Sequence, residues 1–253
     1  MAAPQDPRPI LLVIAKSPAN IYGGRVEKIL RKALTKFESM TTYKPVGMSK
    51  TEATMELPDT KRRLLDAAMK LMLRQGFTAT TVDQICSEAD LTKGSFFHYF
   101  ESKDEIGEGA LDYFYNRQQQ QFAEAEFIRE SDPLERIHGL LDFVIATMKG
   151  SQAQSCLCGN LAQELAHTHP RFRASCDDKF SRFAKLIETT LREARVKYRP
   201  KVDFNPESVS VMFVSLMQGS ILLAKTMQDG KLIGHNLEHF RSYVDTLFGQ
   251  TRK

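Results

Sequence analysis

The chain has 253 residues, of which 42% are hydrophobic and 26% are charged, and its formal net charge is +4. This length allows one sizeable core, or a small domain joined to a larger one. Only 14 glycines and 10 prolines occur, and the periodic stretches are rich in Ala, Leu, Glu, Gln and Lys, which favour helices. Runs of alternating apolar and polar residues joined by hairpin turns, which would indicate β-strands, do not stand out. We therefore expect an all-α protein.

Composition also bears on location and redox state. We find no run approaching the roughly 18 apolar residues of a membrane span, and the apolar run 10–15 is short even for a signal peptide. The cysteines Cys86, Cys156, Cys158 and Cys176 do not suggest a disulfide framework in a chain of this length. We expect reduced thiols, a cytoplasmic protein, no membrane association and no cofactor.

The positive charge is unevenly distributed. Residues 1–56 contain nine Lys and Arg against five Asp and Glu, whereas residues 57–104 contain seven of each and residues 105–253 nineteen of each. The whole excess therefore lies in the N-terminal segment. Net charge by itself gives no support for nucleic-acid binding by the rest of the chain.

We expect residues 1–56 to form a weakly ordered extension, because terminal segments without a partner surface rarely order. One part has an apolar stripe at helical spacing opposite basic residues. The stripe consists of Val26, Ile29, Leu30, Ala33, Leu34 and Phe37. Two alternatives remain open: a basic arm that touches DNA, or sequence upstream of a true start at Met40, Met48 or Met55.

A clear helical period begins at Thr60. Apolar residues recur at helical spacing up to Gly76, which is placed as a glycine at the end of a helix. Phe77 then turns inward. Thr81 and Gln84 form the pattern of a capping box, which predicts the start of a short second helix.

A tight turn and two further helices follow. Asp90 stands where the chain turns, and Asp tolerates a left-handed backbone conformation better than most residues. Thr92 is placed to cap a third helix over 93–99, and the pattern from Ser102 to Glu105 predicts a second capping box and a fourth helix. This spacing predicts a helix-turn-helix domain over residues 57–104.

The same residues carry a family pattern. The stretch 76–103 reads GFTATTVDQICSEADLTKGSFFHYFESK, with a Thr before the second helix, a Lys-Gly-Ser start to the third and an aromatic-rich end followed by Lys. It resembles the N-terminal domain of TetR-type repressors. Departures from the family pattern are Cys86, Asp90, Phe97 and Tyr99, of which the last two leave the operator sequence open. The resemblance implies a homodimer that binds double-stranded operator DNA and responds to an inducer, whose identity is unknown.

A recognition helix places its first side chains at base edges, while flanking groups hold phosphates. We expect Lys93 and Ser95 at or near bases, Gly94 to allow close approach, and Phe97 to contact a thymine methyl. Tyr99 and Lys103 are expected to contact phosphates. The predicted DNA-contacting residues are Thr81, Thr92, Lys93, Gly94, Ser95, Phe97, His98, Tyr99 and Lys103. The alternative is that the two lysines are only solvated charges. Phe96 and Phe100 are expected in the core.

Residues 105–253 are expected to form a helical domain for ligand binding and dimerisation. The segment 155–164, SCLCGNLAQE, resembles repressors related to the N-ethylmaleimide reductase regulator, in some of which a cysteine senses electrophiles or oxidants. We therefore consider Cys156, with Cys158, as a sensor, since a thiol near a helix start has a lowered pKa. The alternative is that Cys156 is a small packing residue. The spacing of Cys156 and Cys158 with His167 and His169 is not one of the familiar zinc patterns, so we expect no metal.

The last two predicted helices each have a broad apolar face, which suggests a four-helix dimer interface. Asn205 and Pro206 are well placed to begin the first of them, and the second is expected after Gly234. The predicted interface consists of Val209, Met212, Phe213, Leu216, Leu237, Phe240, Val244 and Leu247. The alternative is that these residues form intrachain core.

The sequence thus predicts a DNA-binding transcriptional regulator, a repressor released from its operator by a small molecule or an electrophile. A ligand-independent DNA-binding protein of the same fold, acting through assembly or a protein partner, is the second hypothesis. An enzyme is a remote third, because the chain has no nucleophile elbow, phosphate loop, dinucleotide fingerprint or paired carboxylate pattern.

Overall fold

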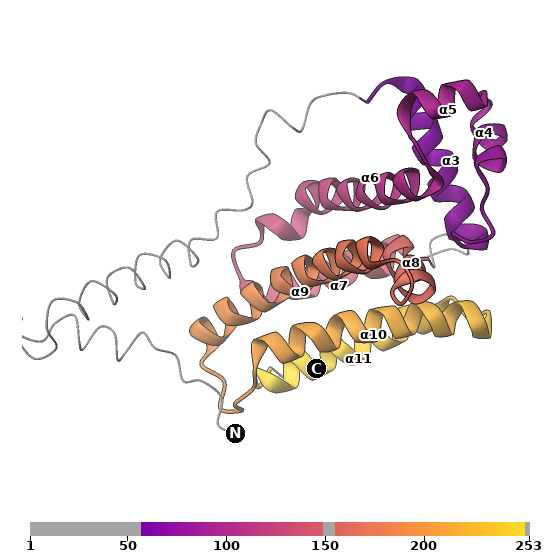
Figure 1. Ribbon diagram of the computed structural model, residues 1–253. Coiled ribbons are helices and arrows are strands. Elements are labelled where there is room, and N and C mark those ends of the chain that lie inside the picture. Colours follow the sequence, from indigo (N-terminus) through magenta and orange to yellow (C-terminus); the bar gives the residue numbers. More distant parts are fainter. Residues whose placement is uncertain (1–56, 149–154, 251–253) are drawn as a thin grey trace, which may run out of the picture. The chain divides into compact units, whose positions relative to one another are not determined.

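The computed structural model describes residues 57–148 and 155–250, so the predicted helical stripe of the N-terminal extension lies outside the described residues. The described part contains nine α-helices, one 3₁₀ turn and no strand, which confirms the all-α expectation (Figure 1). The helices are α3 (Asp59–Gln75), α4 (Val82–Ala89), α5 (Lys93–Tyr99), α6 (Lys103–Glu124), α7 (Pro133–Thr147), α8 (Leu157–Leu165), α9 (Pro170–Tyr198), α10 (Pro206–Met227) and α11 (Lys231–Leu247), with the 3₁₀ turn η1 (Glu126–Arg129) after α6.

The first three helices form a compact unit on the start of α6. Helix α3 packs against α4, α5 and α6 (Figure 1). Leu64 and Ile85 are fully buried between them, and Phe96 and Phe100 turn inward from α5, as predicted. This core fixes the outer face of α5, because burial of its two phenylalanines determines which side faces solvent.

Local capping explains where these helices begin and end. The capping box at Thr81 is present: its hydroxyl accepts a hydrogen bond from Gln84 N at 3.2 Å, and Gln84 Oε1 accepts one from Thr81 N at 3.0 Å. Asp90 takes the turn in the left-handed conformation, with φ 52°. Gly76, with φ 84°, ends α3. All three features agree with what the sequence predicted.

The second predicted capping box is only half formed. Ser102 accepts from Glu105 N at 3.1 Å, as expected. The carboxylate of Glu105, however, accepts from Glu101 N at 2.6 Å, one residue earlier than a capping box requires. Helix α6 still starts at Lys103, since the Ser102 hydroxyl satisfies one of its free backbone donors, Glu105 N.

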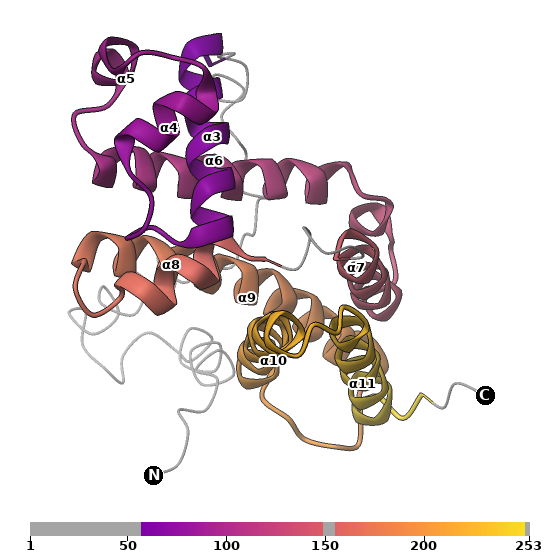
Figure 2. The same cartoon turned by 90° about the vertical axis from the view of Figure 1, so that its right-hand side faces the viewer.

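The remaining helices pack on one another and on α6. Figure 2 shows α10 and α11 side by side, and α10 also packs on α9 while α11 packs on α7. Asn205 begins α10 as predicted, accepting from Glu207 N at 2.9 Å and Ser208 N at 3.3 Å. Helix α11 begins earlier than predicted, at Lys231, because the break after α10 closes at Gly230 and Gly234 lies inside the helix.

The predicted dimer interface stays a prediction, and most of its residues lie inside the protomer. Six of its eight residues are buried within the protomer, which the sequence analysis had held as the alternative. They are Val209, Phe213, Leu237, Phe240, Val244 and Leu247. Only Met212 is exposed, and Leu216 is half-buried. The stronger apolar face of each helix is used for intrachain packing, because α10 and α11 pack on each other and on α7 and α9.

Helix α10 also corrects the expectation about apolar runs. Residues Pro206–Met227 are long and apolar enough to cross a membrane by length and composition alone, with a mean hydropathy of 1.5 over 18 residues. In the fold, 44% of that window is buried inside the protein, against α9 and α11. Its apolar character is therefore explained in large part by packing.

Candidate DNA interface and ligand cavity

The outer face of α5 carries most of the predicted DNA contacts. Thr92, Lys93, Gly94 and His98 are exposed, and Phe97 keeps 57% of its surface exposed. Ser95 and Tyr99 are half-buried, and Thr81 is exposed at the start of α4. The outer face of α5 is therefore accessible to another molecule.

Lys93 does not point freely into solvent. Its Nζ lies 2.7 Å from Asp83 Oδ1 on α4. The hydrogen bond to Asp83 raises the pKa of Lys93 above its ordinary value. The pair links α4 to the first position of α5, where a recognition helix would meet the duplex.

Gly94 has open space where a side chain would be. A Cβ added there would meet only Thr92 Oγ1, at 3.6 Å. Its lack of a side chain is therefore not required by packing within the protein. This agrees with the predicted role of allowing another molecule to approach α5 closely.

Lys103, at the start of α6, makes hydrogen bonds within the protein. Its Nζ donates to the carbonyl of Phe77 at 3.2 Å and of Thr78 at 3.4 Å, and lies 4.4 Å from the centre of the Phe77 ring. The sequence analysis assigned Lys103 to a DNA phosphate. The contact with a phosphate stays a prediction, and the structure adds a second role in holding the loop before α4.

The same loop is held from the other side by Glu164, near the end of α8. Its Oε2 accepts from Phe77 N at 2.8 Å and its Oε1 from Thr78 N at 2.7 Å. Partial burial raises the pKa of Glu164, but the hydrogen bonds from Thr78 and Phe77 outweigh that effect and the pKa is lowered. The glutamate is therefore ionised and bidentate at neutral pH.

One peptide unit lies between the two charges. The Phe77 carbonyl faces the Lys103 ammonium and the Thr78 N–H faces the Glu164 carboxylate. Both charges lie at the favourable ends of the peptide dipole. We call this arrangement of Phe77, Thr78, Lys103 and Glu164 the loop clamp. It joins α8 to the loop before α4 across 86 and 87 residues of sequence, so no local pattern indicated it.

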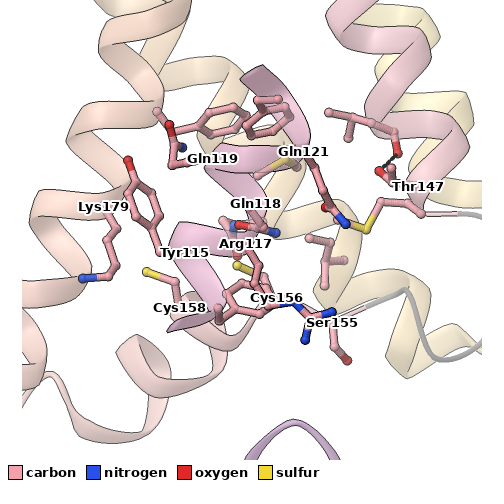
Figure 3. A pocket seen from close by; sticks show the side chains of 18 of the residues that line it. Tyr115, Arg117, Gln118, Gln119, Gln121, Thr147, Ser155, Cys156, Cys158 and Lys179 are labelled. Carbon is pink, nitrogen blue, oxygen red and sulfur yellow. Dashed lines mark hydrogen bonds between the residues drawn. The ribbon is translucent and has the colours of Figure 1, made fainter. Parts of the chain in front are cut away.

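At the other end of α8 lies a cavity of about 420 Å³, which we call the inner cavity (Figure 3). Side chains from α3, α6, α7, α8, α9 and α10 line it. Its aromatic lining consists of Phe114, Tyr115, Phe122, Phe143, Phe180 and Phe183. The volume and the apolar lining are those of a small-molecule site.

Cys156 lines this cavity, but its ionisation differs from the prediction. Burial raises the pKa of the Cys156 thiol, and the neighbouring Gly159 backbone and Gln218 side chain only partly oppose the rise. Cys156 is the N-cap residue of α8, as expected, yet it is 8% exposed. The expected lowering of its pKa is wrong, because loss of water outweighs the effect of the helix start.

Cys158 has a partner that the sequence did not reveal. Its Sγ lies 3.7 Å from the carbonyl oxygen of Cys176 on α9, and Cys176 Sγ lies 3.6 Å from the carbonyl oxygen of Cys158. The hydrogen bond between the two thiols, together with burial, raises the pKa of Cys158. Only the fold brings these cysteines together. Within the described residues, no group of three His, Cys, Asp or Glu side chains is arranged to hold a metal ion.

Comparisons with known proteins agree with this architecture. The family model described as "Bacterial regulatory proteins, tetR family" matches residues 64–108, and "Tetracyclin repressor-like, C-terminal domain" matches residues 133–240. The transcriptional repressor KstR2 of Mycobacterium tuberculosis is 31% identical over 148 residues, which cover 55% of this chain and 70% of that protein. The chain belongs to the TetR family.

Two further similarities extend over most of the regulator. An HTH-type transcriptional regulator encoded in the lacX 3' region of Lactococcus lactis is 28% identical over 72% of this chain and 91% of its own. The crystal structure of Escherichia coli NemR in its reduced form has a TM-score of 0.62 at 25% identity, covering 74% of this chain and 96% of that one. The protein is thus a helix-turn-helix transcriptional regulator, as the sequence predicted, and is similar to NemR.

Proposed function

We propose that this TetR-family regulator is a repressor that leaves its operator when a small molecule enters the inner cavity. It acts in the cytoplasm by binding and not by catalysis. The observation that carries the proposal is the position of α8. Its first residues line the inner cavity, and its last turn supplies Glu164 to the loop clamp.

A short helix can transmit a displacement. α8 has nine residues, so a shift of Cys156 or Cys158 by a ligand moves Glu164 as part of the same rigid element. Glu164 holds the loop that leads into α4, and α4 packs on α5. The ligand site and the operator site then both act on the position of α8, and such a shared element is what allosteric coupling requires.

Operator contact is proposed for the exposed face of α5 and the start of α4, with Lys93 and Ser95 nearest the bases. Reading two half-sites requires a dimer. Because most of the predicted interface is buried in the protomer, we assign dimerisation to the outer face of α10. Its exposed apolar residues are Val211, Met212, Leu222, Leu223 and Met227.

A reversible ligand is favoured over an electrophile. An electrophile needs the Cys156 thiolate, and burial raises the pKa of that thiol. A neutral molecule needs only the apolar cavity that is present. Covalent sensing by Cys156, with or without Cys158, remains the second hypothesis for release.

The test combines operator selection with a ligand screen. Operator duplexes are selected from a random pool with the full-length protein, and compounds that raise its Tm are then titrated into the complex while fluorescence anisotropy is followed. We expect such compounds to weaken operator binding at least about tenfold. Compounds that lose binding in the cavity-filling variant Val144→Phe, yet leave operator affinity of the wild type unchanged, would overturn the proposal.

A separate variant tests whether the effect of the ligand is transmitted through α8. Glu164→Gln replaces one accepting oxygen of the clamp by an NH₂ group, which cannot accept from a backbone N–H. We expect ligand affinity to persist and its effect on operator affinity to shrink. The matched control is Glu108→Gln, which removes a carboxylate that pairs with Arg171 at 2.6 Å outside the clamp. Equal ligand responses in both variants would exclude this route.

A further inference from the structure

The inner cavity has a wall of interlocked rings. Phe122 stacks on Phe183 at 5.7 Å between ring centres, with an angle of 11° between the planes, and lies 5.3 Å from Phe143. Phe183 in turn meets the edge of Phe213 at 5.8 Å. Because α6, α7, α9 and α10 each supply one of these rings, the wall is held by four helices. It is suited to a flat apolar group.

The cations of the cavity are already neutralised. Lys179 Nζ lies 2.6 Å from Asp112 Oδ1 and 2.9 Å from Ser175 Oγ, and Figure 3 shows it beside Tyr115. Arg117 Nη1 lies 3.2 Å from Asp66 Oδ1. Neither Lys179 nor Arg117 is left to neutralise an anionic ligand, since each is already paired with a carboxylate of the protein.

Acidic groups do not face this space either. Among the described residues that line the cavity, none is Asp or Glu. A cationic ligand would therefore lose its water without gaining a counter-charge. The electrostatics of the lining select against both signs of ligand charge.

One polar group in the lining is left without a partner. Gln218 Nε2 is buried and makes no hydrogen bond to any described residue. The amide oxygen lies close to α8, because a Cβ added at Gly159 would be only 2.3 Å from Gln218 Oε1. The side-chain oxygen thus lies against α8, and the amide retains two N–H donors in an apolar setting. A buried donor without an acceptor destabilises the protein, and a ligand that supplies an acceptor removes that cost.

We propose that the inner cavity takes an uncharged, flat, largely apolar molecule that presents a hydrogen-bond acceptor, such as a carbonyl oxygen, to Gln218 Nε2. This inference rests on the proposed function, because it specifies the chemical class of the inducer. The aromatic wall supplies most of the contact area, and Gln218 sets the orientation. The neutralised cations and the missing carboxylates exclude ionised ligands.

The test uses three naphthalenes of matched shape: 2-acetylnaphthalene, 2-ethylnaphthalene and 2-naphthoate. Binding to the full-length protein is measured by calorimetry without DNA. We expect the ketone to bind at least about tenfold more tightly than the hydrocarbon, and naphthoate to bind more weakly than the ketone. Tightest binding by naphthoate, or no measurable binding by any of the three, would overturn the proposal.

Variants assign the preference to Gln218. Gln218→Met removes the donor at similar volume, so the ketone should lose its tenfold advantage while the hydrocarbon binds as before. Gln218→Leu serves the same purpose if the first variant does not fold. The control is Gln120→Leu on the exposed face of α6, whose amide pairs with Glu124 and does not line the cavity. Retention of the ketone preference in Gln218→Met would contradict the assignment.

The same titrations separate this inference from the proposed function. A ketone that binds through Gln218 but leaves operator affinity unchanged contradicts release by cavity ligands and leaves the ligand class intact. If compounds of another chemical class bind the cavity and cause release from the operator, the proposed ligand class is contradicted and release by cavity ligands is supported.

Discussion

At the scale of single residues, Lys93 is exposed but already paired with Asp83 across 2.7 Å. We expect Lys93→Ala to weaken operator binding by about 1–3 kcal/mol while leaving binding to random duplexes nearly unchanged, because a base contact contributes mainly to discrimination. Fluorescence anisotropy on selected and scrambled duplexes measures both. Equal losses of affinity for the two duplexes would show that Lys93 does not contact bases.

Gly94 and Gly107 allow a matched comparison of two glycine-to-alanine changes. A Cβ at Gly94 has open space, whereas one at Gly107 would lie 2.7 Å from the Phe77 ring and 2.9 Å from the Phe172 ring. We expect Gly94→Ala to keep or raise the free energy of unfolding and to weaken DNA binding. Gly107→Ala should lower that free energy by about 1–3 kcal/mol through overpacking. Urea titration and operator anisotropy distinguish the two outcomes.

The raised pKa of Cys156 gives a prediction about pH. Since the pKa lies above its usual 9.0, less thiolate is present at neutral pH than in an exposed cysteine. The rate of alkylation at Cys156 should therefore rise by about tenfold for each unit of pH through 9. Mass spectrometry of the modified peptide follows the rate, with N-acetylcysteine as the control. A rate that is flat between pH 7 and pH 9 would show that the thiolate already dominates, and would revive covalent sensing.

At the scale of helices, substitution of an exposed leucine of α10 and of a buried leucine of α11 should have different effects. Leu223 is 47% exposed on the outer face, whereas Leu237 of α11 is fully buried. We expect Leu223→Glu to fold as a monomer in sedimentation analysis and to bind the operator weakly. Leu237→Ala should instead lower the free energy of unfolding by about 2–5 kcal/mol, because it leaves a cavity in the core. A dimeric Leu223→Glu protein would place the interface elsewhere.

The sequence predicted those elements whose signals are local. The capping box at Thr81, the turn at Asp90 and the Asn205 cap involve residues two or three apart, so their patterns could be recognised directly. Which residues of α10 lie inside the protomer could not be predicted, because that helix is apolar on both faces. Its sequence shows that Phe213 and Met212 are apolar, but only the neighbouring helices decide which is buried.

Other features depend on residues that the chain brings together from far apart. Glu164 and Phe77 are separated by 87 residues, and Cys158 and Cys176 by 18 residues across two helices. Neither pair follows from periodicity or spacing. The unpaired amide of Gln218 is equally hidden, because a missing partner can be recognised only once its surroundings are known.

At the scale of the whole molecule, the N-terminal segment carries the whole excess of positive charge, yet we expect it to be dispensable, because terminal segments without a partner surface rarely order. Residues 57–253 contain 26 basic and 26 acidic residues, so the excess of +4 belongs to residues 1–56. We expect a chain starting at Met55 to fold, dimerise and bind the operator with unchanged affinity and salt dependence. Anisotropy at several salt concentrations checks this. Weaker binding with a smaller salt slope, and an intact dimer, would instead identify the segment as a DNA arm.

The loop clamp also constrains how such regulators can be recombined. An exchange of DNA-reading modules between relatives would carry Phe77, Thr78 and Lys103 in one part and leave Glu164 in the other. If release passes through α8 as proposed, a hybrid keeps its response to ligand only when the recipient supplies an acidic side chain where Glu164 stands. On that route, a graft without it would bind DNA yet ignore the inducer, and one carboxylate would decide the compatibility of sensor and reader.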